Sequence, residues 1–363
     1  MTLSPKFLYL SELGTGNGDG WQLSQYEIAA VLAYTYTGTA PDSTLIDLAE
    51  EEALSDPNVR YAQAKRLLNT PAASEYLNQF FISLLQILPE RLSDKGTLPE
   101  NIAAAMWDEL RLLMPEIILK DKGGLRELYS PGYTFVNKAL AVHYGIEASG
   151  LDDGMSKVGS QIYGGLINMG AFYATVSEEN NTHPIFRARI LRENLLCYDL
   201  GTPIDFNSEG LRAPKIASTR EFWTAVNGPD AANGDCWGCH KYMNDIGFAV
   251  DVFGDDGKHR EEETRLIDGQ EYVYTLLTDG MLNSIDGKNI PITGLTGGSG
   301  LAAAYGNSNQ AAFCLGEQYL KFTRGGVKNR EDIVYLKAVY DRSEQIVEMF
   351  AAQARLPSFI NRN

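Results

Sequence analysis

The sequence has few cations for its length and no long apolar run. Among 363 residues, 31 lysines and arginines face 47 aspartates and glutamates, which gives a formal net charge of −16. Nucleic acids and anionic membrane surfaces are bound by clustered cations. Because the sequence contains no such cluster, we expect no nucleic-acid partner. No apolar stretch approaches the ~20 residues that a helix needs to cross a bilayer, so no membrane span is expected.

The start of the sequence lacks the features of a secretory signal. Residues 1–10 contain one lysine and a four-residue apolar run at 7–10. A signal peptide has a longer apolar region, followed by a cleavage site made of small residues. We therefore expect no signal peptide in this chain.

Cysteine and histidine are also scarce, with four of each. Four cysteines are too few for a disulfide scaffold in a chain of this size. The sequence is instead 44% hydrophobic and 21% charged. That balance predicts a folded globular protein whose length is sufficient for two or more packed cores.

Helical periodicity dominates the hydrophobic pattern. Residues 77, 80, 81, 84, 85 and 88 are apolar and fall on one helical stripe, and Ser24 stands where the N-cap of an earlier helix belongs. Strand signals are confined to short pieces such as 272–277. The expected fold is mainly α and multi-helical, with at most a small β-hairpin in the C-terminal half.

Stretches rich in glycine, asparagine and aspartate punctuate the helical pattern. They lie at 14–20, 149–154, 227–235 and 293–309. Such residues mark loops and turns. We therefore expect two lobes, a helical N-terminal lobe over residues 1–150 and a helical C-terminal lobe over residues 151–363 that contains every cysteine.

The most informative motif is Cys236-Trp237-Gly238-Cys239-His240. Two thiols three residues apart lie on one helical turn, where each can add to a vinyl group of the same porphyrin. The adjacent imidazole can then bind the iron from below the ring. The motif therefore predicts a covalently attached c-type haem, with Cys236 and Cys239 as attachment points and His240 as an iron ligand.

Two other interpretations of the cysteine pair stay open. A zinc site would combine Cys236 and Cys239 with two further ligands, drawn from Cys197, Cys314 or a histidine, although the sequence has no second close-spaced ligand pair. A thioredoxin-like dithiol would require a βαβ unit around the motif, which the pattern does not show.

The remaining site candidates are less specific. Cys197 and Cys314 are either two buried thiols or one disulfide between helices, and we favour the disulfide because haem attachment and disulfide formation both require export. Three arginines of one helix, at 187, 189 and 192, are expected to pair with local acids, the alternative being a haem propionate.

The sixth iron ligand is not fixed by the motif. Met243 follows His240 by one turn and is expected on the same side of the ring. Met281 has the reach and the soft thioether for the opposite side, so it is our candidate. His183 and His259 are rivals, and an open sixth position is also compatible with the motif.

Several stretches resemble, in order, the large planctomycete-type cytochrome proteins of unknown function. The motif with Met243 is the most distinctive of them, and Asn244-Asp245 departs from the family's usual Asp-Pro. The resemblance covers nearly the whole chain. The other stretches include residues 3–9, 25–29, 133–137, 143–145, 164–166, 246–249 and 357–359.

The resemblance implies an exported protein with a c-type haem. Family members generally carry an export signal and often another cytochrome module upstream, so a periplasmic or extracellular location is expected for the full-length protein. Three functions stay open: electron transfer to a basic redox partner or an upstream cytochrome module, a haem-dependent oxidoreductase, and a structural or interaction protein whose cysteine cluster is stabilised by zinc or a disulfide.

Overall fold

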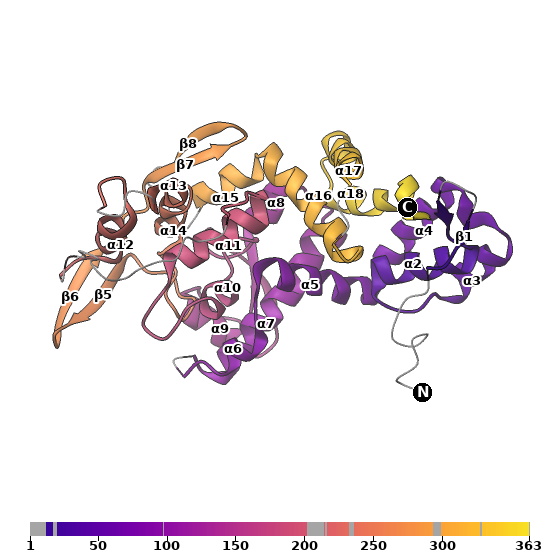
Figure 1. Ribbon diagram of the computed structural model, residues 1–363. Coiled ribbons are helices and arrows are strands. Elements are labelled where there is room, and N and C mark those ends of the chain that lie inside the picture. The colour runs from indigo at the N-terminus through magenta and orange to yellow at the C-terminus, as the bar shows by residue number, and fades with distance from the viewer. Residues whose placement is uncertain are drawn as a thin grey trace. The chain divides into compact units, whose positions relative to one another are not determined.

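A computed structural model describes residues 12–16, 20–96, 98–201, 214, 216–231, 236–292, 299–326 and 329–362. Helices predominate, and the strands form only small antiparallel sheets (Figure 1). The mainly α class predicted from the periodicity is therefore confirmed. Within these residues, no helix is both long enough and apolar enough to cross a membrane.

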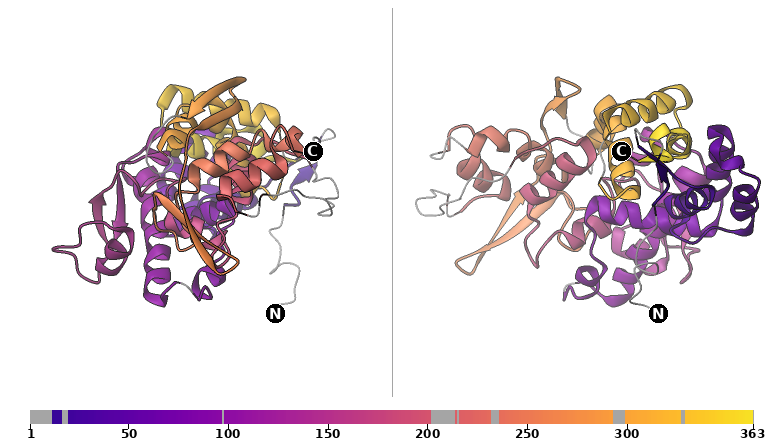
Figure 2. Two further views of the ribbon diagram at one scale, coloured as in Figure 1. Left: turned by 90° about the vertical axis from the view of Figure 1, so that its left-hand side faces the viewer. Right: turned by 45° about the vertical axis from the view of Figure 1, so that its right-hand side comes forward.

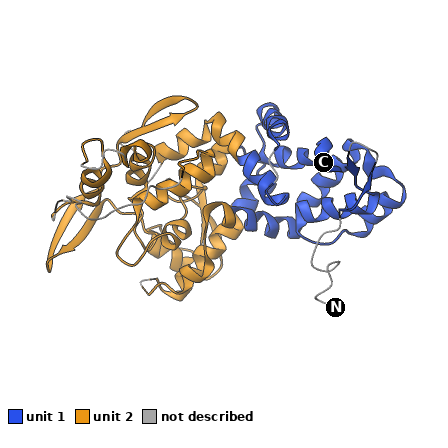
Figure 3. Cartoon of the chain, in the orientation of Figure 1, with its two compact units in different colours: residues 1–81, 114–124, 315–363 blue, residues 82–113, 125–314 orange. Residues whose placement is uncertain are grey.

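The chain forms two compact units, and each is built from separate stretches of sequence (Figure 3). Unit 1 comprises residues 1–81, 114–124 and 315–363, and unit 2 comprises residues 82–113 and 125–314. This division differs from the sequential lobes 1–150 and 151–363, because the C-terminal helices are grouped with the N-terminal ones. Glycine-rich stretches indicate where loops lie, but they do not indicate which helices pack together.

Unit 1 is built mainly from helices, and part of α5 and of α16 belongs to unit 2. Its elements are β1 (Thr15–Gly16), β2 (Trp21–Gln22), α2 (Gln25–Thr37), α3 (Ser43–Glu50), η1 (Ala53–Ser55), α4 (Pro57–Leu68), α5 (Pro71–Leu85), η2 (Glu116–Lys120), α16 (Asn309–Thr323), α17 (Arg330–Ser343), α18 (Ile346–Ala352), η5 (Gln353–Arg355), η6 (Pro357–Phe359) and β9 (Asn361–Arg362).

The core of unit 1 joins the two ends of the chain. Tyr319 stacks on Phe350 with ring centroids 3.7 Å apart, and Phe80 packs edge-on against both rings. The buried guanidinium of Arg60 on α4 donates from Nε to the carbonyl of Ala354 at 2.7 Å. Buried contacts of this kind, between residues nearly 300 positions apart, place the C-terminal helices with the N-terminal ones.

Local sequence signals set the ends of two helices in unit 1. Ser24 and Glu27 form a capping box at the start of α2, which satisfies amide groups that the first helical turn leaves free. The buried stripe of α5 ends with the helix at Leu85. Leu88, which the sequence placed on that stripe, therefore lies outside the helix and is 41% exposed.

Unit 2 combines short helices with three hairpin-like strand pairs. Its elements are α6 (Pro89–Ser93), α7 (Glu100–Pro115), α8 (Leu125–Tyr129), β3 (Tyr133–Val136), α9 (Lys138–Tyr144), β4 (Ser156–Gly159), α10 (Gly170–Thr175), α11 (Pro184–Leu196), α12 (Thr219–Asn227), α13 (Trp237–His240), α14 (Asn244–Val250), β5 (Glu262–Ile267), β6 (Gln270–Thr275), β7 (Gly280–Ile285), β8 (Lys288–Ile292) and α15 (Ser299–Gly306).

The C-terminal half contains two hairpins, β5–β6 and β7–β8, where the sequence predicted at most one. Both turn on an Asp-Gly pair, Asp268-Gly269 and Asp286-Gly287, and all four residues have positive φ. Such pairs suit the two-residue turns that match the twist of antiparallel strands. Figure 2 shows the β5–β6 hairpin extending away from the neighbouring helices of unit 2.

The core of unit 2 contains a buried carboxyl group, Glu109 on α7. It accepts hydrogen bonds from the hydroxyl of Thr134 and, at 2.7 Å, from the hydroxyl of Tyr144. Burial raises the pKa of Glu109 from 4.5 to about 7, although both hydrogen bonds favour the carboxylate. At pH 8 the folded protein therefore holds a buried charge that it does not hold at pH 5.

We expect Glu109→Gln to flatten the pH dependence of stability. Between the unfolded pKa of 4.5 and the folded pKa of about 7, the folded state binds more protons than the unfolded state. Stability is therefore lost as pH rises through this window, by about 3 kcal/mol from this group. Urea unfolding of both proteins at pH 5 and pH 8 measures the difference. An identical loss of stability in the variant would show that Glu109 does not titrate in this window.

Candidate functional site

The Cys-x-x-Cys-His motif forms the short helix α13 in unit 2. Neither Cys236 nor Cys239 takes part in a disulfide; Cys236 is partly buried and Cys239 is exposed. The Sγ atom of Cys239 lies 3.5 Å from the carbonyl oxygen of Leu200. Both thiols are thus on one turn, and at least one is accessible to a reactant from solvent.

His240 is held by one of its two ring nitrogens. Its Nδ1 lies 3.1 Å from Oδ1 of Asn244, one turn further along the chain. If Nδ1 carries the proton, it donates to this oxygen and leaves Nε2 with a free lone pair. Within the described ranges, no hydrogen bond to Nε2 is present. Burial lowers the pKa of His240, while the bond to Asn244 acts in the opposite direction.

A second amide extends this contact into the core of unit 2. Nδ2 of the buried Asn244 donates to Oδ1 of the buried Asn227 at 2.8 Å. This bond joins α14 to α12 and orients Oδ1 of Asn244 toward His240. The sequence marks Asn244 only as a departure from the family's Asp-Pro and does not single out Asn227. The spacing of four residues from His240 to Asn244 is a signal that could have indicated their contact.

One side of the motif is bordered by a buried cation and two tyrosines. The guanidinium carbon of Arg192 lies 4.2 Å from the ring centroid of Tyr198 and 5.4 Å from that of Tyr242. Its Nη2 donates to the carbonyl of Ser284 at 3.0 Å. Arg192 thus pairs with aromatic rings and a carbonyl rather than with the local acid that the sequence suggested.

The other two arginines of α11 have acidic neighbours. Arg189 binds Glu193 at 3.0 Å. Arg187, which is fully buried, lies 3.8 Å from Asp251 and donates to the carbonyls of Phe253 and Gly254. Burial lowers the pKa of Arg187 to about 10, so it stays charged at neutral pH and caps the segment that follows α14.

Cys197 and Cys314 form a disulfide, with their Cα atoms 5.3 Å apart. Cys197 ends α11 in a left-handed conformation, with φ of 48°, and Cys314 lies in α16. The bond closes a loop of 117 residues that contains the whole motif. It also removes Cys197 and Cys314 from the candidate ligands of the zinc interpretation, which leaves a histidine as the remaining kind of candidate.

The methionines near the motif differ in exposure. Met243 is buried, at 7% exposure, one turn after His240. Met281 is 40% exposed on β7, and its backbone amide donates to Asp245 at 2.7 Å. Strand β7 thus lies against the segment that follows His240.

The rival histidines have partners outside the motif. His183 lies 3.2 Å from Glu178, and the ring of His259 packs edge-on against Phe253. In the part of the chain that the structure describes, no group of three or more histidine, cysteine, aspartate or glutamate side chains is arranged to hold a metal ion.

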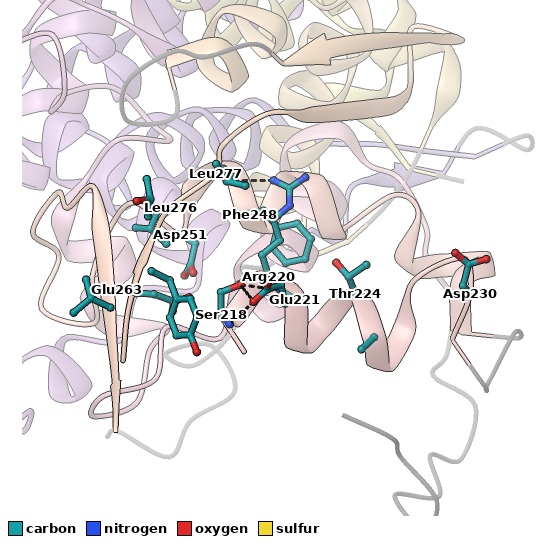
Figure 4. A pocket seen from close by; sticks show the side chains of 14 residues that line it. Ser218, Arg220, Glu221, Thr224, Asp230, Phe248, Asp251, Glu263, Leu276 and Leu277 are labelled. Carbon is teal, nitrogen blue, oxygen red and sulfur yellow. Dashed lines mark hydrogen bonds between the residues drawn. The ribbon is translucent and has the colours of Figure 1, made fainter. Parts of the chain in front are cut away.

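An open cavity of about 730 Å³ lies beside the motif's supporting helices (Figure 4). Its lining comes from α12, from the end of α14 and from the β5–β6 hairpin. Phe248 and the leucines at 276 and 277 supply apolar surface, and Asp251 and Glu263 supply carboxyl groups. The volume lies within the range of ~300–1,000 Å³ that ligand sites occupy. No pattern in the sequence indicates this cavity.

Two protein-family models match the chain. The model described as PSD4, protein of unknown function (DUF1592), matches residues 23–146. The model described as PSCyt3, protein of unknown function (DUF1588), matches residues 163–263, which include the whole motif. No curated protein and no solved structure matches the chain.

Proposed function

We propose that this chain, which belongs to the planctomycete cytochrome c-like proteins of unknown function that carry these two domains, is an exported electron-transfer protein with one c-type haem on α13. The observation that carries the proposal is the state of the turn itself. It presents two thiols outside any disulfide and an imidazole whose Nδ1 is already engaged.

The donor set fits a c-type haem. Cys236 and Cys239 are spaced for two thioether bonds to one porphyrin, and the exposure of Cys239 leaves room for attachment. His240 would bind iron through Nε2. When bound, the haem supplies a one-electron iron couple that a protein side chain cannot provide.

The asparagine pair is the supporting shell of this ligand. A metal-bound histidine usually donates its second N–H to a fixed acceptor, which sets the tautomer and the ring orientation. Asn244 is such an acceptor, and Asn227 fixes its amide in turn. Asn244 is neutral, whereas the carboxylate usual at this position in the family would make the imidazole a stronger electron donor.

The charge of the chain indicates the kind of redox partner. With a formal net charge of −16, the surface attracts a basic protein and accelerates its association at low ionic strength. An upstream cytochrome module in the same polypeptide is the other partner that the family organisation suggests. The exported location, periplasmic or extracellular, belongs to this proposal because haem c is attached outside the cytoplasm.

A haem-dependent oxidoreductase is the second candidate, and the cavity beside α12 and α14 favours it. We expect the visible spectrum of matured protein to separate the two. A six-coordinate low-spin spectrum with a thioether charge-transfer band, lost in Met281→Ala, supports electron transfer with Met281 as a ligand. A high-spin ferric spectrum that changes when peroxide is added contradicts electron transfer and favours catalysis. Stoichiometric zinc without haem would instead select a structural role for the cysteines.

A further inference from the structure

The outer edge of strand β6 is unpaired within the described residues, since β5–β6 forms a two-stranded sheet. The hairpin pairs Ile267 with Gln270 across its two-residue turn, and alternate pairs from that point share ladder hydrogen bonds. The bond from the amide of Leu276 to the carbonyl of Glu261, at 2.9 Å, continues this series. The amide and carbonyl groups of Val273 and Thr275 therefore point away from β5.

This outer edge borders the cavity. Residues 273–277 all line it. The backbone carbonyl of Leu277 points outward like those of Val273 and Thr275. It accepts a hydrogen bond from Arg220 on α12 at 2.7 Å. Figure 4 shows this bond between the helix and the end of the strand. An added strand along β6 would thus lie partly within a preformed hollow.

One face of the hairpin carries three exposed apolar side chains among polar ones, because Glu262, Thr264, Glu271 and Thr275 share this face by register. Leu266, Val273 and Leu277 share this face by register and are 71%, 59% and 62% exposed. On β6 itself Val273 and Leu277 flank Thr275, and exposed apolar side chains at the edge of a sheet can contribute to an interaction surface. A third strand would extend this face and bury part of it.

The cavity that borders the β6 edge is acidic. Glu221, Asp230, Asp251 and Glu263 line the cavity, against the single cation Arg220. Arg220 is engaged by the carbonyls at 277 and 279.

Not all four carboxylates are available to a ligand. Asp251 lies 3.8 Å from Arg187 and 3.7 Å from Arg260, so part of its charge is offset. Glu221 and Asp230 are exposed at the rim. Hydrogen bonds from Ser218 lower the pKa of Glu221 and keep it ionised. The rim is therefore the part of the cavity suited to a cation.

We propose that the β6 edge binds an extended peptide of alternating apolar and basic residues as a third strand. Successive side chains of a strand point to opposite faces. The apolar side chains would continue the exposed face of Leu266, Val273 and Leu277, while the basic ones would face the rim carboxylates of Glu221 and Asp230. Backbone hydrogen bonds to the outward groups supply the pairing, as in other strand-addition complexes. The site does not depend on the haem.

A second copy of this chain fits the edge less well than a basic peptide. The β6 segment itself, Gln-Glu-Tyr-Val-Tyr-Thr, carries one glutamate and no cation. Pairing two β6 edges would therefore bring acidic surfaces together, which charge repulsion opposes.

The test uses the capped hexapeptide KVKVKV, labelled with fluorescein, and two matched proline variants. Thr275→Pro removes an amide that points out from β6, and Thr264→Pro removes the equivalent amide on the outer edge of β5. Neither amide belongs to the β5–β6 ladder, and proline is tolerated at such edge positions. We expect Thr275→Pro to weaken binding about tenfold, from one lost hydrogen bond and the bulk of the ring. Binding to Thr264→Pro should equal wild-type binding.

Several outcomes would overturn the proposal. These are no binding by the wild-type chain, equal losses in both variants, or equal binding of EVEVEV. A dimer that Thr275→Pro dissociates would assign the edge to a second copy instead. If Thr275→Pro fails to fold, KVKVKV with alternate backbone N-methyl groups, tested against wild-type protein, keeps the test decisive. N-methylation on the pairing edge should abolish binding.

Discussion

Serine at both Cys236 and Cys239 should leave the matured chain without haem after denaturation, whereas the unchanged chain keeps its haem on a denaturing gel. Without the two thioether bonds, only the iron–His240 bond would hold the porphyrin, and unfolding releases a group held that way. The measurement is haem staining with a pyridine haemochrome assay, after production with a cytochrome c maturation system and an added export signal.

The matched control for this variant removes the other two cysteines. Cys197→Ser with Cys314→Ser changes the same number of cysteines but leaves α13 intact, so its staining should equal that of the unchanged chain. Persistent staining of the Cys236/Cys239 variant would show that the haem is attached elsewhere.

The double serine variant at Cys197 and Cys314 is also expected to lose stability, which is the second large effect. The disulfide closes a loop of 117 residues, and restricting so long a loop in the unfolded chain stabilises the folded state by about 3–5 kcal/mol. We expect the free energy of unfolding of unit 2 to fall by that amount in the double serine variant. Denaturant unfolding of oxidised protein, followed by tryptophan fluorescence, measures it.

The chain itself offers a comparison for the disulfide effect. Reducing wild-type protein should lower its stability to that of the double serine variant and should not change the variant. Equal stability of oxidised wild type and variant would mean that the bond contributes nothing in solution.

Patterns that depend on neighbours in sequence could be predicted well. The helical stripes predicted a mainly α fold, because one apolar face every 3.6 residues is a local property. Cys236, Cys239 and His240 lie on one turn because their spacing fixes that geometry. The Asp-Gly pairs at 268–269 and 286–287 are local signals of the same kind, but the prediction of at most one hairpin did not use them.

Features that depend on which elements pack together were beyond the sequence. Nothing local indicates that Arg60 binds the backbone of Ala354 or that Asn244 meets Asn227. The prediction of a lobe boundary at residue 150 rests on the composition of one loop. The compact units are instead defined by long-range contacts between helices. The cavity beside β6 has the same origin, since its lining residues come from two helices, α12 and α14, and from both strands of the β5–β6 hairpin.

The sixth ligand illustrates the same limit. Met281 was predicted as the sixth ligand because it lies far enough along the chain from His240 to reach the other side of a haem. In the structure, its strand β7 contacts Asp245. The charge-transfer band of the matured protein, compared with that of Met281→Ala, tests Met281 as the ligand.

The intact mass of the denatured, matured chain tests the central proposal most directly. A mass greater than that of the polypeptide by one haem, together with pink colour after unfolding, is the expected result. A colourless protein whose mass equals that of the bare polypeptide would contradict haem attachment at α13.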